Sequence, residues 1–141
     1  RILPKRIIDC FRCGIINMHA GKLPDNRGLD NVQWAVLHDI PQEASLHFIN
    51  SQIDRGALVP SKRIKVEIDD SIFDLQLKLM NAEQELLLDF IPKLSSLTPQ
   101  DISALPQISK GTYHSILGDI NLELFDAKLK SYCDKWSSLP L

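Results

Sequence analysis

The sequence predicts an α/β fold, in which short strands alternate with helices along one domain. Apolar runs of strand length alternate with segments whose apolar residues recur every three or four positions. The predicted order is helix, strand, helix, strand, strand, helix, which is typical of α/β proteins. The 141 residues suffice for one domain with a core, and the chain is 44% hydrophobic and 24% charged, as in globular proteins.

The first half of the chain is expected to hold two helices and two strands. Pro4 suits the first turn of a helix, and Gly14 can end that helix. Residues 15–18 form a short apolar run, which predicts a buried strand. Asp30 can cap a second helix with its side chain, and residues 45–49 predict a second strand.

The second half begins with a strand and continues into a long helix. Apolar and charged side chains alternate over residues 63–68, which is the period of a half-exposed strand. Ser71 and Asp74 make a capping box, and the amphipathic helix behind it is expected to end before Pro92. Residues 93–118 are rich in Pro, Gly, Ser and Thr, which predicts a linker or an extended wrap.

The last segment, residues 119–141, predicts a carboxy-terminal amphipathic helix capped by Asp119 or Asn121. Docking onto its own domain is the favoured role for this helix, and pairing with a partner's helix is the alternative. The organisation expected is therefore one α/β portion over residues 1–92, the linker or extended wrap over 93–118 and this helix over 119–141.

The charge balance excludes some classes of partner. The net charge is −2, so no sequence-wide basic surface favours a nucleic acid. No apolar run approaches the length of a membrane span, and no signal peptide is visible. We therefore expect a cytoplasmic protein that does not bind membranes.

The three cysteines support a reducing compartment and no metal site. Cys10 and Cys13 form a single C-x-x-C, while Cys133 lies far away. A redox pair or half of a zinc site would have this spacing, but no second pair completes four ligands. Two cysteines at one helix end is the favoured interpretation, and the odd count argues against a disulfide framework.

Two apolar runs end in polar side chains of the kind that acyl-transfer chemistry needs. The first ends in Asn17-x-His19 and is followed at once by a Gly- and Pro-rich loop. The second covers residues 45–49 and is followed by Asp54-x-Gly56. An amide, an imidazole and a carboxylate at strand ends indicate an enzyme.

The combined motif resembles the folate-dependent formyltransferases, which act on glycinamide ribonucleotide, methionyl-tRNA or sugar nucleotides. The pattern is carried, in order, by Asn17-x-His19, Leu23-Pro24, Arg27-Gly28 and Asp54-x-Gly56. The resemblance covers about residues 1–92. It implies a partial doubly wound, Rossmann-like domain that lacks its amino-terminal strands, so the chain is expected to be part of a longer protein.

The resemblance also implies a set of site residues and a formyl donor. The donor would be 10-formyltetrahydrofolate, with no metal. The catalytic residues implied are Asn17, His19 and Asp54. The loop expected to contact the folate holds Asp54, Arg55 and Gly56, and the residues expected on the substrate side are Leu23, Pro24, Arg27 and Gly28. His47 could line this site, although packing within its strand is the favoured role.

The chemistry of formyl transfer gives each implied catalytic residue a task. An amine that attacks a formyl carbon creates a negatively charged oxygen, and Asn17 and a protonated His19 could donate hydrogen bonds to it. Asp54 could raise the pKa of His19 and move protons through a bound water.

The acceptor expected is the primary amine of a nucleotide-linked sugar. Gly21-Lys22 resembles the sugar enzymes more than the purine and tRNA enzymes, and the segment from Leu105 to Tyr113 resembles one found in sugar and tRNA enzymes. Methionyl-tRNA and glycinamide ribonucleotide are alternative acceptors. A deformylating hydrolase and a catalytically inactive interaction module are alternative functions, and a homodimer is possible.

Overall fold

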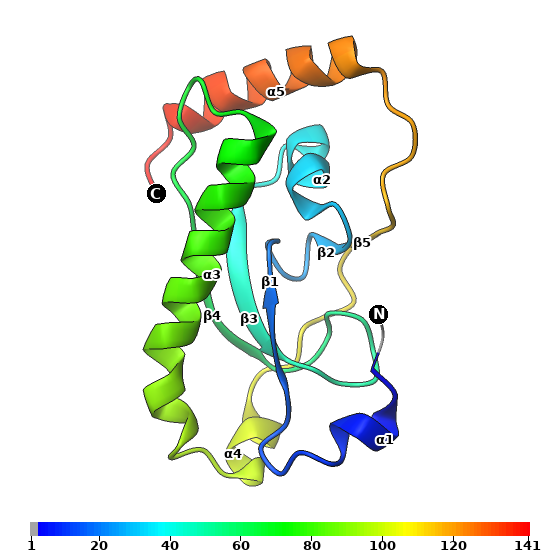
Figure 1. Cartoon of the computed structure of the whole chain (residues 1–141), viewed down its shortest axis with the longest axis vertical. Coiled ribbons are helices and arrows are strands. Elements are labelled where there is room, and N and C mark those ends of the chain that lie inside the picture. Colours follow the sequence, from blue (N-terminus) through cyan, green and yellow to red (C-terminus); the bar gives the residue numbers. More distant parts are fainter. Residues whose placement is uncertain (1–2) are drawn as a thin grey trace.

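The computed structural model describes residues 3–141, and a three-stranded sheet lies at its centre (Figure 1). Its strands are β1 (Ile16–His19), β3 (Glu43–Phe48) and β4 (Leu58–Arg63), in the order β1-β3-β4. Both pairs are antiparallel, with Asn17 opposite His47 and Ser45 opposite Ser61. The expected α/β class is confirmed, and this portion of it contributes antiparallel strands.

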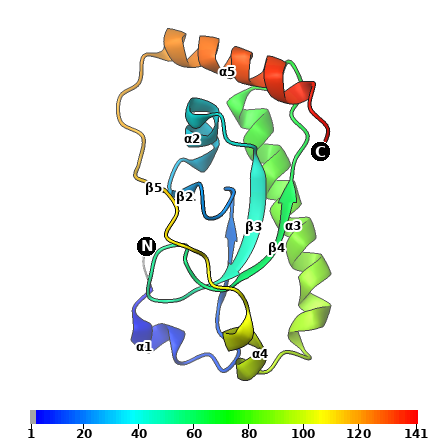
Figure 2. The ribbon, with the colours of Figure 1, turned by 180° about the vertical axis from the view of Figure 1, so that it is seen from behind.

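The long helix α3 (Ile72–Leu94) covers one face of this sheet and forms most of the core with it (Figures 1 and 2). Its buried residues, spaced three and four apart, are Leu75, Leu79, Ala82, Leu86 and Phe90. They pack against strand residues that include Leu46 and Phe48. Burial of such side chains contributes roughly 1.5–3 kcal/mol each, so this interface dominates the stability of the fold.

The start of α3 agrees with the sequence prediction, and its end does not. The Ser71 side chain accepts from the Asp74 N–H, and the Asp74 side chain accepts from the Ser71 N–H, which completes the capping box. The helix continues through Pro92 to Leu94. Pro92 is exposed and lies in the last turn, where water can replace the hydrogen bond that proline cannot donate.

The alternating segment at residues 63–68 was wrongly predicted to be a strand. The strand β4 ends at Arg63, and the chain then leaves the sheet. Ile64 and Val66 are nevertheless buried, whereas Ile68 is 65% exposed. The alternation therefore reflects side chains of an extended segment that enter the core. Its backbone keeps one hydrogen bond toward the sheet, from the Ile64 N–H to the Gln42 carbonyl at 3.1 Å, and forms no strand ladder.

The two amino-terminal helices also differ from the predictions. Helix α1 spans only Lys5–Ile8 and buries no residue, so no core contact extends it toward Gly14. Helix α2 (Asn31–His38) follows Asp30, whose side chain makes no cap hydrogen bond to it. Asp30 adopts φ 49°, and its carboxylate accepts from the N–H of Leu117 instead.

The predicted linker contains regular structure. Helix α4 (Pro99–Ala104) begins with a second capping box, formed by Thr98 and Asp101, which sequence reasoning missed. Beyond it the chain runs extended, and β5 (Tyr113–His114) pairs in parallel with β2 (Arg27–Gly28). The segment therefore wraps back over the loop that follows β1.

Helix α5 (Leu122–Ser137) packs across α2 at one end of the molecule (Figure 2). The Asn121 side chain caps it by accepting from the N–H of Leu124. The Tyr132 hydroxyl donates to the Ile40 carbonyl at 2.7 Å, which fixes the helix to its own domain. None of the helices in the described residues has the length and apolar character needed to cross a membrane.

Candidate active site

The strand β1 delivers Asn17 and His19 to the face of the sheet away from α3. Because side chains alternate along a strand, these two share a face, and Met18 between them points to the other. His47 of β3 lies directly opposite Asn17, and the Asn17 amide donates to His47 Nε2 at 3.1 Å. Two imidazoles and an amide thus gather over two neighbouring strands.

A tight turn after β3 brings Asp54 onto the same face. Asp54 adopts φ 48°, a left-handed conformation that aspartate tolerates better than most residues. Gly56 lies so close to the carbonyl of Phe48 that any β-carbon there would overlap it. The Asn50 side chain closes the turn by donating to the Arg55 carbonyl at 3.0 Å. Backbone and side-chain contacts therefore fix where the carboxylate points.

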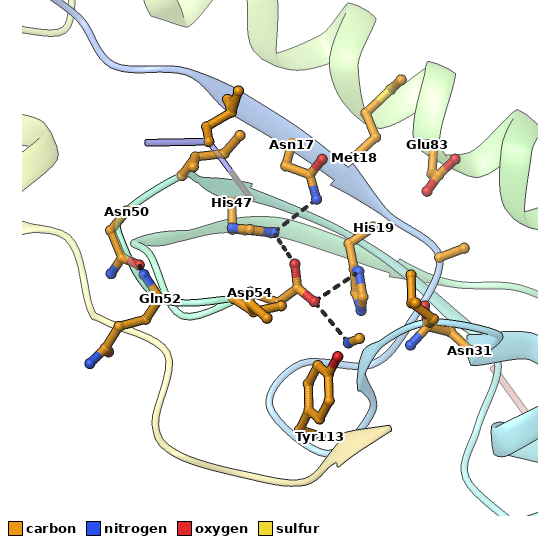
Figure 3. A pocket seen from close by; sticks show the side chains of 16 residues that line it. Asn17, Met18, His19, Asn31, His47, Asn50, Gln52, Asp54, Glu83 and Tyr113 are labelled. Atoms are coloured by element: carbon orange, nitrogen blue, oxygen red, sulfur yellow. Dashed lines mark hydrogen bonds and ion pairs between the residues drawn. The ribbon is translucent and has the colours of Figure 1, made fainter. Parts of the chain in front are cut away.

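The Asp54 carboxylate is the meeting point of the site (Figure 3). Its Oδ1 lies 3.5 Å from His47 Nε2, and its Oδ2 lies 3.8 Å from His19 Nδ1. The main-chain N–H of Gly28 donates to Oδ2 at 2.8 Å. Asn17, His19 and Asp54, named from the sequence, are brought together, and His47 links the amide to the carboxylate.

The hydrogen bonds of His19 identify its tautomer. Its Nε2 lies 2.8 Å from the main-chain oxygen of Asn26, and because a carbonyl can only accept, Nε2 carries the proton. Burial lowers the pKa of His19, and this effect outweighs the hydrogen bond to Asn26 and the charge of Asp54, which raise it. His19 is therefore neutral near pH 7, with the lone pair of Nδ1 facing Asp54. The Asp54 carboxylate raises the pKa of His19, as expected, but burial has the larger effect, so the ring of the free site favours its neutral form.

For Asp54, the contacts with neighbouring groups outweigh the effect of burial on the pKa. Burial favours its neutral form, but the contacts from His47, His19 and the Gly28 N–H together lower the pKa of Asp54 below its ordinary value. The carboxylate is therefore ionised over the whole physiological range. A neutral base and an ionised acid next to each other are suited to accepting a proton and stabilising the imidazolium that results.

A pocket of about 760 Å³ opens in front of these groups. Its wall includes Asn17, His19, Gly28, His47 and Asp54. The remaining lining residues are Leu3, Met18, Ala20, Leu29, Asn31, Ile49, Asn50, Gln52, Ile53, Glu83 and Tyr113. This size is typical of a pocket for a small molecule.

Five of the residues expected to bind folate or substrate do not line this pocket. They are Leu23, Pro24, Arg27, Arg55 and Gly56. Leu23 and Arg27 are buried, and the Arg27 guanidinium donates to the Ile53 carbonyl at 2.8 Å. Within this structure, Arg27 ties the loop before β2 to the turn that carries Asp54. Of the predicted substrate-side residues, Gly28 alone reaches the pocket.

Several lining residues were missed or undervalued in the sequence. His47 was assigned to packing, although an antiparallel partner of Asn17 must share its face. Glu83 comes from α3, and burial raises the pKa of its carboxyl. Tyr113 comes from β5, far along the chain, and no local pattern indicated its place.

The cysteines take no part in the site. Cys10 is exposed and Cys13 is partly exposed near α1, whereas Cys133 is buried in α5. Within residues 3–141, no three side chains of His, Cys, Asp or Glu gather in a way that could hold a metal ion.

Comparison with known proteins identifies the family to which this chain belongs. The family model for formyl transferases matches residues 1–91. The chain therefore belongs to the formyl transferase family. It is 30% identical over 119 residues to the methionyl-tRNA formyltransferase of Thermosynechococcus vestitus, covering 80% of this chain and 36% of that enzyme. The chain thus spans about a third of the length of this curated relative.

Solved structures show the same fold. The formyltransferase PseJ from Anoxybacillus kamchatkensis, in complex with UDP-4,6-dideoxy-4-formamido-L-AltNAc and tetrahydrofolate, matches with a TM-score of 0.72 and 24% identity. The match covers 98% of this chain and 68% of PseJ. The N-formyltransferase from Helicobacter canadensis, solved with folinic acid and dTDP-3-aminofucose, matches at a TM-score of 0.66 and 18% identity, covering 84% and 46% of the two chains. The Rossmann-like portion inferred from the motif is confirmed.

Proposed function

We propose that this protein transfers a formyl group from 10-formyltetrahydrofolate to the primary amine of a nucleotide-linked sugar. The observation that carries the proposal is the convergence of Asn17, His19 and Asp54 on one pocket wall. The three groups come from two separate segments of the chain, and each is held by a partner that fixes its orientation. Family membership supports the reaction class.

In this proposal His19 has the role of base, which its neutral ring and the nearby carboxylate support. The lone pair of Nδ1 accepts a proton from the amine as its nitrogen bonds to the formyl carbon. Asp54, 3.8 Å away, stabilises the imidazolium. His19 then returns the proton to the departing folate nitrogen as the bond from that nitrogen to the formyl carbon breaks. Proton and bonds balance without a further reactant.

Asn17 has the role of stabilising the oxygen that becomes negative. One N–H of its amide is engaged by His47 Nε2, and the amide has a second N–H to donate. Since His47 Nδ1 lies 3.1 Å from the Phe48 carbonyl, the His47 ring is fixed at both nitrogens and holds the amide in place. Removing one donor of this kind typically lowers the rate about 10²–10³-fold.

The identity of the acceptor is supported by the fold neighbours. PseJ matches over nearly the whole chain, and its structure holds a formylated UDP-sugar. Methionyl-tRNA is the second candidate, because relatives that match at 30% identity carry that activity in their names. The net charge of −2 gives this chain no general basic surface for tRNA, which favours the sugar.

The test is transfer from 10-formyltetrahydrofolate to three acceptors offered separately: a UDP-linked 4-amino-4,6-dideoxy sugar, methionyl-tRNA and glycinamide ribonucleotide. We expect product with the sugar. The variants Asn17→Ala, His19→Ala and Asp54→Asn should each lower turnover about 10²–10³-fold. Asn81→Ala, at an exposed position of α3, is the matched control and should leave turnover unchanged.

Other results of the transfer assay would contradict the mechanism or indicate a different function. Turnover that survives Asn17→Ala and His19→Ala contradicts the mechanism. Release of formate without an amine indicates a hydrolase, and preference for methionyl-tRNA assigns the second candidate. Failure to bind folinic acid in calorimetry indicates an interaction module.

A further inference from the structure

Tyr113 is an exposed aromatic side chain on the wall of the pocket. Its side chain is 47% exposed, although its neighbour in β5, His114, is buried. In Figure 3 the ring stands beside the catalytic groups, with its hydroxyl end toward Asp54. Among the described residues that line the pocket, Tyr113 is the only Phe, Tyr or Trp.

The Tyr113 ring packs on Gly28, and Gly28 in turn contacts the Asp54 carboxylate. A β-carbon added at Gly28 would lie 2.9 Å from the Tyr113 Cε2, so the ring packs directly on the glycine backbone. The N–H of the same glycine donates to Asp54 at 2.8 Å. Whatever lies against the ring is therefore next to the reaction centre.

The backbone that carries the ring is fixed. Tyr113 pairs with Arg27 in the parallel β2–β5 ladder, and the N–H of Arg27 donates to the Thr112 carbonyl at 3.0 Å. Two residues earlier, Gly111 adopts φ +45° and lies so close to the Pro24 carbonyl that a β-carbon would overlap it. A ring held this way loses little conformational freedom when a ligand binds.

A buried cation lies near the ring. The Arg27 guanidinium carbon is 6.0 Å from the centre of the Tyr113 ring, and Arg27 is only 7% exposed. Its Nε is buried without a hydrogen-bond partner in the described residues. A cation at this distance from a ring is attracted by the ring face, so Arg27 helps to hold the Tyr113 ring in place.

We propose that Tyr113 is a specificity-determining residue that stacks against a planar conjugated ring of a substrate. The identity of the probes rests on the proposed function, which supplies two sources of such a ring. One is the folate, whose aryl and pterin rings flank the transferred group, and the other is the base of the nucleotide. Both sources share the same stacking chemistry, and separate titrations distinguish them.

The chain has only two tyrosines, which makes a direct test possible on the unaltered protein. With ¹³C-labelled tyrosine rings, Tyr113 and Tyr132 give the whole set of ring signals, and Tyr113→Phe assigns them. Tyr132 is 2% exposed and serves as the internal control. We expect folinic acid or UDP, titrated separately, to move the Tyr113 signal upfield and to leave Tyr132 unchanged. The proposal is overturned when neither probe moves it.

Affinity provides the second measurement. Tyr113→Leu should weaken binding of the ligand that stacks by roughly tenfold or more, whereas Tyr113→Phe should retain it. Phe73→Leu replaces a 70% exposed aromatic residue outside the pocket and is the matched control. Unchanged affinity of Tyr113→Leu for both probes contradicts the proposal. Formyl transfer with no ring shift rejects this inference alone, and a ring shift with UDP but no transfer rejects the proposed function alone.

Discussion

Gly28 and Asp54 are joined by a hydrogen bond of 2.8 Å from the glycine N–H to the carboxylate, across 26 residues of sequence. The same glycine pairs with His114 in the β2–β5 ladder. The loop after β1, the turn after β3 and the returning carboxy-terminal segment therefore meet at one residue without a side chain. The hydrogen bond from Gly28 helps to hold the Asp54 carboxylate in position and contributes to the lowering of its pKa.

Gly28→Ala should damage both stability and activity. Gly28 adopts φ +102°, and a β-carbon there would overlap the His114 carbonyl. We expect a loss of about 2–4 kcal/mol in the free energy of unfolding, from backbone strain and separation of the two strands. Urea unfolding measures this loss. Gly118→Ala is the matched control, because nothing lies within 4 Å of its added β-carbon; equal effects of the two variants would contradict the prediction.

The free energy of unfolding should fall in mild acid, because protonation of His19 disfavours the folded state. Its pKa is lowered in the folded state, so the folded protein prefers the neutral ring. This contribution is complete above the unfolded pKa of about 6.5 and is lost as the pH falls from there through the folded pKa. In urea unfolding between pH 5 and 8, we expect a shallower decline for His19→Gln than for the unaltered chain. His38→Gln, at an exposed position, is the control, and identical slopes for all three proteins would refute the assignment.

Glu83→Gln should stabilise the protein at neutral pH. Burial raises the pKa of this carboxyl, so its ionised form disfavours folding once the pH exceeds the unfolded value. Removing the charge should raise the melting temperature by about 1–2 °C at pH 7 and have no effect near pH 3. Asp89→Asn alters an exposed acid of the same helix and should change nothing. A lower melting temperature for Glu83→Gln would show that the charge has a stabilising partner.

Tyr132→Phe tests how α5 is attached. The Tyr132 hydroxyl donates to the Ile40 carbonyl at 2.7 Å, and the ring is buried. Loss of this bond leaves the carbonyl unsatisfied and should cost about 1 kcal/mol in the free energy of unfolding. Tyr113→Phe removes a hydroxyl from a half-exposed ring and should cost less. Equal unfolding midpoints for the two variants would mean that the hydrogen bond contributes nothing to docking.

The grouping of Asn17, His19 and Asp54 at one pocket could be predicted from the sequence because these residues lie in short, local motifs. Asn17-x-His19 and Asp54-x-Gly56 each combine polar side chains with a strand end or a turn that glycine permits. The protonation of His19 could not be predicted in this way, since it depends on burial by residues that the motif does not contain. The same applies to Glu83, which reaches the pocket from the long helix.

Helices and strands could be predicted where the spacing of apolar residues in the sequence agrees with the side chains that are buried in the structure. Helix α3 was found from its apolar face and its capping box, because both features are local. The segment after Arg63 was wrongly predicted to be a strand. Side chains that alternate between core and solvent give the same sequence pattern whether or not the backbone pairs with another strand. Residues 93–118 were predicted to be a linker or an extended wrap, because Pro and Gly interrupt regular structure. In the structure the same residue types also allow the close approach of Gly111 to Pro24.

The pairing of β2 with β5 has a consequence for how the molecule is made. Asn17 and His19 are synthesised before His114, and Gly28 has no strand partner until His114 follows. Contacts between such distant residues form slowly, because a long stretch of chain must be ordered first. The contact of Gly28 with Asp54 should therefore reach its final geometry only after β5 has been synthesised.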